Sequence, residues 1–192
     1  MTIQTNQLQP RSRNVLSRRH QAGFTLTELM IAAVIIAIGI ALVYSGVKAY
    51  MAKDRANTEG KELPTIFTNI QSKYSQRANY SGATCAGLIN LGVFPNVRVA
   101  TPTTLTNRWG GAITCAVGTV TATNDVLNLS YTMIPEAECK DIVPMIEDAV
   151  RVVTVGGTTV KADNAQTDLD ALGTACKAGG QNNSIVYSVG KA

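Results

Sequence analysis

The chain has few of the residues on which catalysis and large apolar cores usually depend. Its 192 residues include one histidine, one tryptophan and three phenylalanines. The histidine, His20, stands in a basic stretch near the N-terminus, and a nucleophile without a neighbouring base is not activated. No pair of cysteines has the C-x-x-C spacing of a zinc site, and no glycine-rich phosphate loop is present. The sequence therefore predicts no enzyme, no metal site and no cofactor.

The scarcity of aromatic residues also limits the core that the chain can build. Beyond residue 80 the chain is rich in Thr, Asn, Gly, Ala and Val, so its core must consist mainly of small side chains. Such a core is thin and needs reinforcement. Four cysteines lie in this region, and an even number predicts two disulfides and an oxidising compartment. Four cysteines allow three pairings: they are Cys85, Cys115, Cys139 and Cys176.

Acidic residues are absent from residues 1–23, which contain four arginines, Arg11, Arg13, Arg18 and Arg19. The remaining residues carry 13 basic and 13 acidic side chains, so the net charge of +4 belongs to the N-terminal stretch. A basic stretch directly before an apolar block is typical of the cytoplasmic side of a membrane segment. It argues against nucleic acid as a partner.

Charge is also absent from residues 29–47, a run of 19 residues that forms a helix about 28 Å long and can cross a bilayer. The run could be a signal-peptide core, a permanent signal anchor, or a membrane helix that later serves another purpose. It is longer than a signal peptide requires, and residues 44–50 make a poor cleavage site. Glu28 stands at its start, where a deeply placed carboxylate costs about 3 kcal/mol. Alone, Glu28 could simply reach the interface or stabilise the first helical turn.

The residues around Glu28 form a recognisable sequence motif. The string from Gln21 to Met30, QAGFTLTELM, followed by the apolar run, closely resembles the processing site of type IV prepilins. The resemblance implies that a prepilin peptidase cleaves between Gly23 and Phe24 and methylates the new N-terminal amine of Phe24. It also implies that Glu28 acts in assembly, where it would pair with the ammonium group of a neighbouring copy in a medium of low dielectric constant.

Residues 24–80 are predicted to form one long helix, of which residues 24–47 are the transmembrane or fibre-core half. Further along, Ile66, Ile70 and Tyr74 recur every four residues, which indicates a helix lying against a sheet. We expect the helix to reach about Ala78, with a kink or break at Pro64. Glycines at 39, 46 and 60 are expected to weaken it.

Residues 81–192 are predicted to form a globular head of short elements. Alternation of apolar and polar residues predicts a strand at 127–133, and Gly156-Gly157 predicts a hairpin over 152–160. Further strands are expected at 112–117, 119–122 and 183–189, and helices at 85–91 and from Pro135 to 143. Residues 100–107 and 179–184 are expected to be exposed loops.

The head resembles the PilS-like branch of type IVb pilins, in which an alternating strand leads into a Pro–Glu–Cys helix. That resemblance implies a Cys139–Cys176 disulfide that closes a C-terminal loop, which leaves Cys85–Cys115 as the second. The phenylalanine at 24 is instead typical of type IVa pilins, whereas the leader of 23 residues and the larger head favour type IVb. The implied fold is α+β: a long N-terminal helix packed on an antiparallel sheet, the pilin roll.

The expected function is that of a major subunit of a type IVb pilus, for adhesion, aggregation or conjugation. The expected partners are other copies of the chain, prepilin peptidase, the assembly machinery of the inner membrane, and a receptor on a host or recipient cell. The precursor would lie in the inner membrane of a Gram-negative bacterium and the fibre outside it. Two alternatives remain open: a minor pilin or secretion-system pseudopilin, and a signal-anchored periplasmic binding protein that never polymerises.

Overall fold

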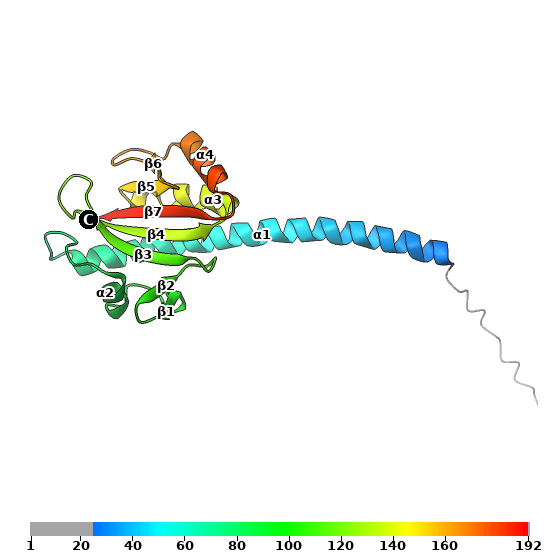
Figure 1. Cartoon of the computed structure of the whole chain (residues 1–192), viewed down its shortest axis with the longest axis horizontal. Helices are drawn as coiled ribbons and strands as arrows, with labels where there is room; N and C mark the ends of the chain where they lie inside the picture. Colours follow the sequence, from blue (N-terminus) through cyan, green and yellow to red (C-terminus); the bar gives the residue numbers. More distant parts are fainter. Residues whose placement is uncertain (1–24, 192) are drawn as a thin grey trace, which may run out of the picture. The chain divides into compact units, whose positions relative to one another are not determined.

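The computed structural model describes residues 25–191, which fall into two compact units with their boundary after Val43. The helix α1, Leu26–Tyr74, begins in the first unit and ends in the second (Figure 1). The second unit, the head, also holds a single antiparallel sheet and three shorter helices. The α+β fold predicted from the sequence is thereby confirmed, including the long N-terminal helix and the antiparallel sheet.

The expected break at Pro64 is wrong, because α1 continues through it to Tyr74. A proline removes one helical hydrogen bond, but the turns on either side of it are held by buried side chains such as Leu63 and Ile66. Gly60 also does not interrupt the helix. A Cβ atom at Gly60 would lie 2.7 Å from Cε of Met145, so this glycine allows close packing.

The sheet has seven strands in the order β1-β2-β3-β4-β7-β5-β6, and every neighbouring pair is antiparallel. The predicted hairpin is present, with Gly156 and Gly157 both at positive φ between its two strands. The strands are β1 (Val99–Thr101), β2 (Thr104–Thr106), β3 (Ala112–Gly118), β4 (Val126–Ile134), β5 (Val152–Val155), β6 (Thr158–Lys161) and β7 (Asn183–Gly190).

The shorter helices are α2 (Cys85–Asn90), α3 (Glu136–Met145) and α4 (Leu169–Gly179), with single 3-10 turns η1 (Asn96–Arg98) and η2 (Glu147–Ala149). Three expectations need correction. The strand expected at 119–122 is absent, the stretch 100–107 contains most of β1 and all of β2, and α4 lies where no helix was expected. The stretch 179–184 is only partly an exposed loop, because the side chain of Asn183 is buried at the start of β7.

The core lies between α1 and one face of the sheet. Phe67 of α1 packs against Tyr187 of β7, with ring centroids 5.8 Å apart, and Tyr187 in turn meets Tyr131 of β4 at 5.4 Å. These rings are buried, as are the alternate residues Leu127 and Leu129 of β4. The alternation that predicted β4 therefore corresponds to one buried face and one more exposed face.

A buried ion cluster joins the middle of α1 to the segment that holds η1. Arg98 is paired with Glu59 and also with Glu62 at 2.9 Å, and Arg108 contacts both carboxylates. Side chains of Arg98 and Glu59 are 2 % and 1 % exposed. Burial raises the pKa of the Glu59 carboxyl and outweighs the nearby Arg98. For Glu62, burial is outweighed by hydrogen bonds from Arg98 and Arg108, so its pKa is lowered.

Replacing Arg98 by methionine should destabilise the head by about 3–5 kcal/mol, because it leaves a buried carboxylate without its main partner. The double variant Glu59→Met/Arg98→Met should recover most of this loss, since Glu62 and Arg108 remain paired with each other. Urea unfolding of the full chain in detergent would measure both. Breaking the exposed Lys140–Glu136 pair with Lys140→Met is the control, with a change of about 1 kcal/mol or less. A single variant as stable as the wild type would contradict a structural role for the cluster.

A second cluster organises the loop that was expected to be a strand. Arg151 pairs with Asp125 at 2.7 Å and also with Asp163. The Asp125 carboxylate accepts hydrogen bonds from the main-chain N–H groups of Val120, Thr121 and Ala122. Burial raises the pKa of Asp125, but these hydrogen bonds outweigh it and hold the pKa well below its usual value of 3.8.

Because the pKa of Asp125 is lower in the folded state than in the unfolded state, its contribution to stability is present above pH 3.8 and is lost as the pH falls through the folded value. We expect Asp125→Asn to reduce the unfolding free energy at pH 7 by about 1–3 kcal/mol. The difference from the wild type should shrink below pH 3.8. Urea unfolding between pH 2 and pH 7 would test this, and a difference that does not change with pH would contradict it.

Candidate functional site

The first turn of α1 contains a reciprocal set of hydrogen bonds between Thr25 and Glu28. The Thr25 N–H and hydroxyl both donate to Oε2 of Glu28 at 3.0 Å, and the Glu28 N–H donates to Oγ1 of Thr25 at 3.3 Å. This arrangement is a capping box, which satisfies main-chain donors that the start of a helix leaves without partners. The Glu28 carboxylate therefore has a defined position on the helix before any other molecule contacts it.

The turns that follow expose an almost continuous apolar surface. Every large apolar side chain from Leu26 to Val43 is at least 57 % exposed. The most apolar 18 residues of α1 have a mean hydropathy of 2.6, so the helix is long and apolar enough to cross a membrane. Glu28 is the one charged residue between residues 25 and 47. A surface of this size on a protein needs a lipid or protein partner.

Two disulfides reinforce the head, and they join the pairs expected from the sequence. Cys85–Cys115 links α2 to β3 with Cα atoms 5.2 Å apart, and Cys139–Cys176 links α3 to α4 at 5.9 Å. Each bridge connects two elements that are separated by 30 or more residues. Such cross-links stabilise a fold mainly by constraining its unfolded state.

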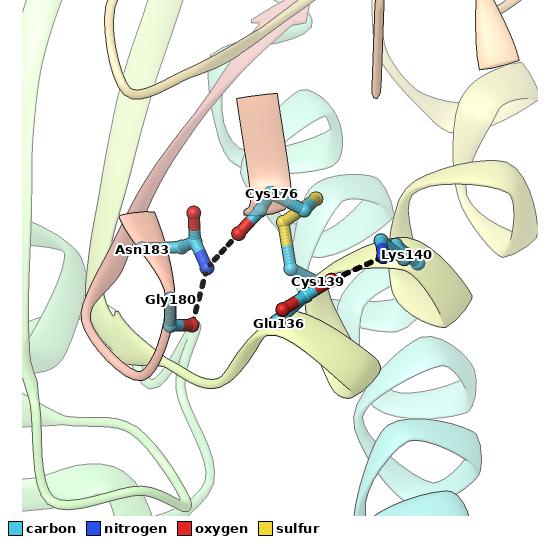
Figure 2. Close-up of a disulfide and its surroundings, with 6 residues drawn as sticks. All are labelled: Glu136, Cys139, Lys140, Cys176, Gly180 and Asn183. Atoms are coloured by element: carbon cyan, nitrogen blue, oxygen red, sulfur yellow. Dashed lines mark hydrogen bonds and ion pairs between the residues drawn. A yellow bond between two sulfur atoms is a disulfide. The ribbon is translucent and has the colours of Figure 1, made fainter. Parts of the chain in front are cut away.

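The Cys139–Cys176 bridge lies beside a buried asparagine that holds the end of α4 (Figure 2). Asn183 Nδ2 donates to the carbonyl groups of Cys176 and Gly180, both at 3.0 Å. A Cβ atom on Gly179 would lie 2.2 Å from Oδ1 of Asn183, so only glycine fits there. The bridge and Asn183 together close the segment between α3 and β7.

The head and the N-terminal segment match two family models. The model described as PilS N terminal matches residues 53–189, and the prokaryotic N-terminal methylation motif matches residues 18–44. The first match covers more than two thirds of the chain. The chain belongs to the PilS family. It is a type IV pilin, and the methylation motif implies a subunit of a pilus.

Solved structures of pilins share the fold of this pilin at low sequence identity. The type IV b pilin from Salmonella typhi is 19 % identical with a TM-score of 0.56, and the match covers 70 % of this chain and 99 % of that one. TcpA, a type IV pilin from Vibrio cholerae El Tor biotype, is 13 % identical with a TM-score of 0.52, over 70 % and 98 % of the two chains. Comparison with curated protein sequences gives no match. Family and fold are those of structural subunits, so the prediction that the chain is not an enzyme is confirmed.

The residues predicted to act in processing, Gly23 and Phe24, lie outside the described residues, as does the basic leader. Glu28 is at the start of α1, as expected, but its partner Thr25 was not predicted. The spacing T-x-x-E of a capping box was the signal for it. Asn183 was also missed, and no pattern in the sequence marks it. Residues 25–191 contain no group of three metal-binding side chains.

Replacing Thr25 by valine should weaken the first turn of α1 in this pilin. The change removes the hydroxyl that accepts a hydrogen bond from the Glu28 N–H and donates one to the Glu28 carboxylate. We expect faster amide hydrogen exchange at Glu28, by up to about tenfold for a cap worth about 1 kcal/mol. Thr25→Ser keeps the hydroxyl and should exchange at the wild-type rate. NMR of the chain in detergent micelles measures both, and equal rates in Thr25→Val would contradict the capping role.

Proposed function

We propose that the chain is the major subunit of a type IVb pilus that serves adhesion, aggregation or conjugation. The observation that carries this proposal is the apolar face of α1, exposed throughout residues 26–43, with a single carboxylate, Glu28, at its start. A lipid bilayer can cover such a face before assembly, and the equivalent helices of other copies can cover it afterwards. Both partners are apolar, so the same side chains suit both environments.

In the proposed fibre, Glu28 determines how neighbouring subunits are aligned. Prepilin peptidase cleaves between Gly23 and Phe24, which creates an ammonium group four residues before Glu28, and methylates it. In the low-dielectric centre of a fibre, an unpaired carboxylate is costly and a paired one is tolerated. The Glu28 carboxylate of one copy pairs with the ammonium of Phe24 in the next, so only a correctly placed neighbour satisfies both charges.

The precursor is held in the inner membrane of a Gram-negative bacterium by residues 24–47, and the assembly machinery there transfers the cleaved chain to the growing fibre. The two disulfides support the location of the head on the oxidising side of that membrane. The formal neutrality of residues 24–192 after removal of the leader supports close packing of heads, because neighbouring subunits do not repel each other.

Glu28→Gln should leave a cleaved chain in the membrane and reduce sheared fibre by about tenfold or more, since the ammonium of the neighbouring copy then lacks its partner. Immunoblots of sheared and membrane fractions measure the distribution. Asp54→Asn, which neutralises another exposed acid on the same helix, is the matched control and should leave fibre yield unchanged. Normal piliation of Glu28→Gln would refute the pairing role.

Mass spectrometry of the N-terminal peptide from sheared surface protein tests the processing step. A peptide that begins at N-methylated Phe24, from the most abundant sheared protein, is the expected result. The same peptide at low abundance would instead assign a minor pilin or pseudopilin. Recovery only from membranes, with Arg18 and Arg19 still attached, would mean a permanent anchor and would refute the fibre.

A further inference from the structure

The head contains a polar cavity of about 460 Å³ that neither the core nor the apolar helix uses. It lies beside the end of β7, close to the C-terminus marked in Figure 1. Its walls come from four separate parts of the head: Gln71 of α1, the η2 segment with the two residues before β5, the end of β6 with the loop that follows it, and Gly190 at the end of β7. This volume is within the range of small-molecule sites.

The cavity has a rigid base. The Gly190 carbonyl accepts hydrogen bonds from Nε2 of Gln71 and from the hydroxyl of Tyr80, both at 3.0 Å. A Cβ atom on Gly190 would lie 2.2 Å from Cδ of Arg151, so the glycine allows the arginine side chain to cross the end of the strand. Arg151 is then held by Asp125 and Asp163. The base is therefore fixed before a ligand arrives.

Lys161 is the unusual member of the lining, because its side chain is almost wholly buried yet incompletely paired. The residue is 6 % exposed, and its ammonium group donates one hydrogen bond, to the Arg151 carbonyl at 3.1 Å. An ammonium group has three donors. Hydrogen bonds from Thr167 lower the pKa of Glu147, and the hydrogen bond from Arg151 lowers that of Asp163. Lys161 adds a smaller electrostatic contribution to both, but it forms no ion pair with either carboxylate. Two of its donors therefore have no acceptor among the described residues and are left for an acceptor in the cavity.

Charges of the two signs are balanced around this cation. The lining holds three acidic and three basic side chains, Glu147, Asp148, Asp163, Arg151, Lys161 and Lys191. The side-chain amides of Gln71, Asn164 and Gln166 also line the cavity. A charged ligand would therefore meet both attraction and repulsion from this lining. A neutral ligand whose groups both donate and accept hydrogen bonds can pair with either sign.

We propose that this cavity binds a neutral carbohydrate residue, whose hydroxyl groups accept from Lys161 and the amides and donate to the carboxylates. The lining has no aromatic ring on which a sugar could stack, so binding by one subunit is weak. A polymer repeats the site along its length, and several weak contacts together raise the overall affinity by 10² or more, on the order expected for linked sites. Binding by a single subunit does not depend on polymerisation.

The test uses the full chain in a detergent without a sugar headgroup and follows ligand signals by saturation-transfer NMR. The probes are neutral methyl hexosides and methyl N-acetylhexosaminides, with methyl glucuronide and glucosamine as charged comparisons. We expect one or more neutral glycosides to bind with a dissociation constant of about 1 mM, and the charged probes to bind more weakly. No binding of any neutral glycoside, or tighter binding of glucuronide, would overturn the proposal.

Two variants locate the binding in the cavity. Lys161→Met keeps the length of the side chain and removes the donors, and should weaken binding by about tenfold or more. Asn164 has φ +56°, so Asn164→Gly removes its amide without backbone strain and should weaken binding severalfold. The matched control is Asn124→Gly, at φ +60° outside the lining. Wild-type affinity in both cavity variants would overturn the proposal, whereas normal fibre formation in them leaves the pilus function intact.

Discussion

The packing of one face of α1 on the antiparallel sheet is the interaction on which the rest of the head depends. Leu63, Phe67 and Ile70 of that face are buried, and the ring of Phe67 packs against Tyr187 of β7. The same helix anchors the ends of the head. Glu59 and Glu62 hold Arg98, and Gln71 holds the main chain at Gly190. A displacement of α1 would therefore release three regions that are far apart in the sequence.

The elements that were predicted correctly are those whose conformation is determined by residues close together in the sequence. Alternation over 127–133 reflects a strand with one buried face, and Gly156-Gly157 reflects a turn with two positive φ angles. The errors arose where distant contacts outweigh local preference. Pro64 stays within a helix whose face is held by the sheet. The stretch 119–122 is a loop because Asp125 draws its main-chain N–H groups together.

For a related reason, the motif around Glu28 could be predicted from the sequence and the cavity beside Gly190 could not. The N-terminal methylation motif is a continuous string of residues, so it is visible in the sequence, and its family model matches residues 18–44. The cavity beside Gly190 is assembled from four segments, and only the fold brings Lys161 to Gln71. Lys161 looks like an ordinary strand residue in the sequence. Its importance depends on burial and on the number of its partners, neither of which has a local pattern.

Some charged side chains of this pilin are paired within the chain, whereas others are left for another molecule to pair. Arg98, which is buried, and Arg151, which is partly exposed, each pair with two carboxylates within the head, so these charges need no partner from another molecule. Glu28 is satisfied on its own helix by Thr25 while it is exposed, and it becomes costly only when the surrounding medium becomes apolar. A charge of this kind does not disturb the free subunit, yet it penalises any assembly that does not provide a cation. Lys161 differs because it is almost wholly buried in the free subunit with one hydrogen bond, so its remaining donors favour a polar ligand in the cavity.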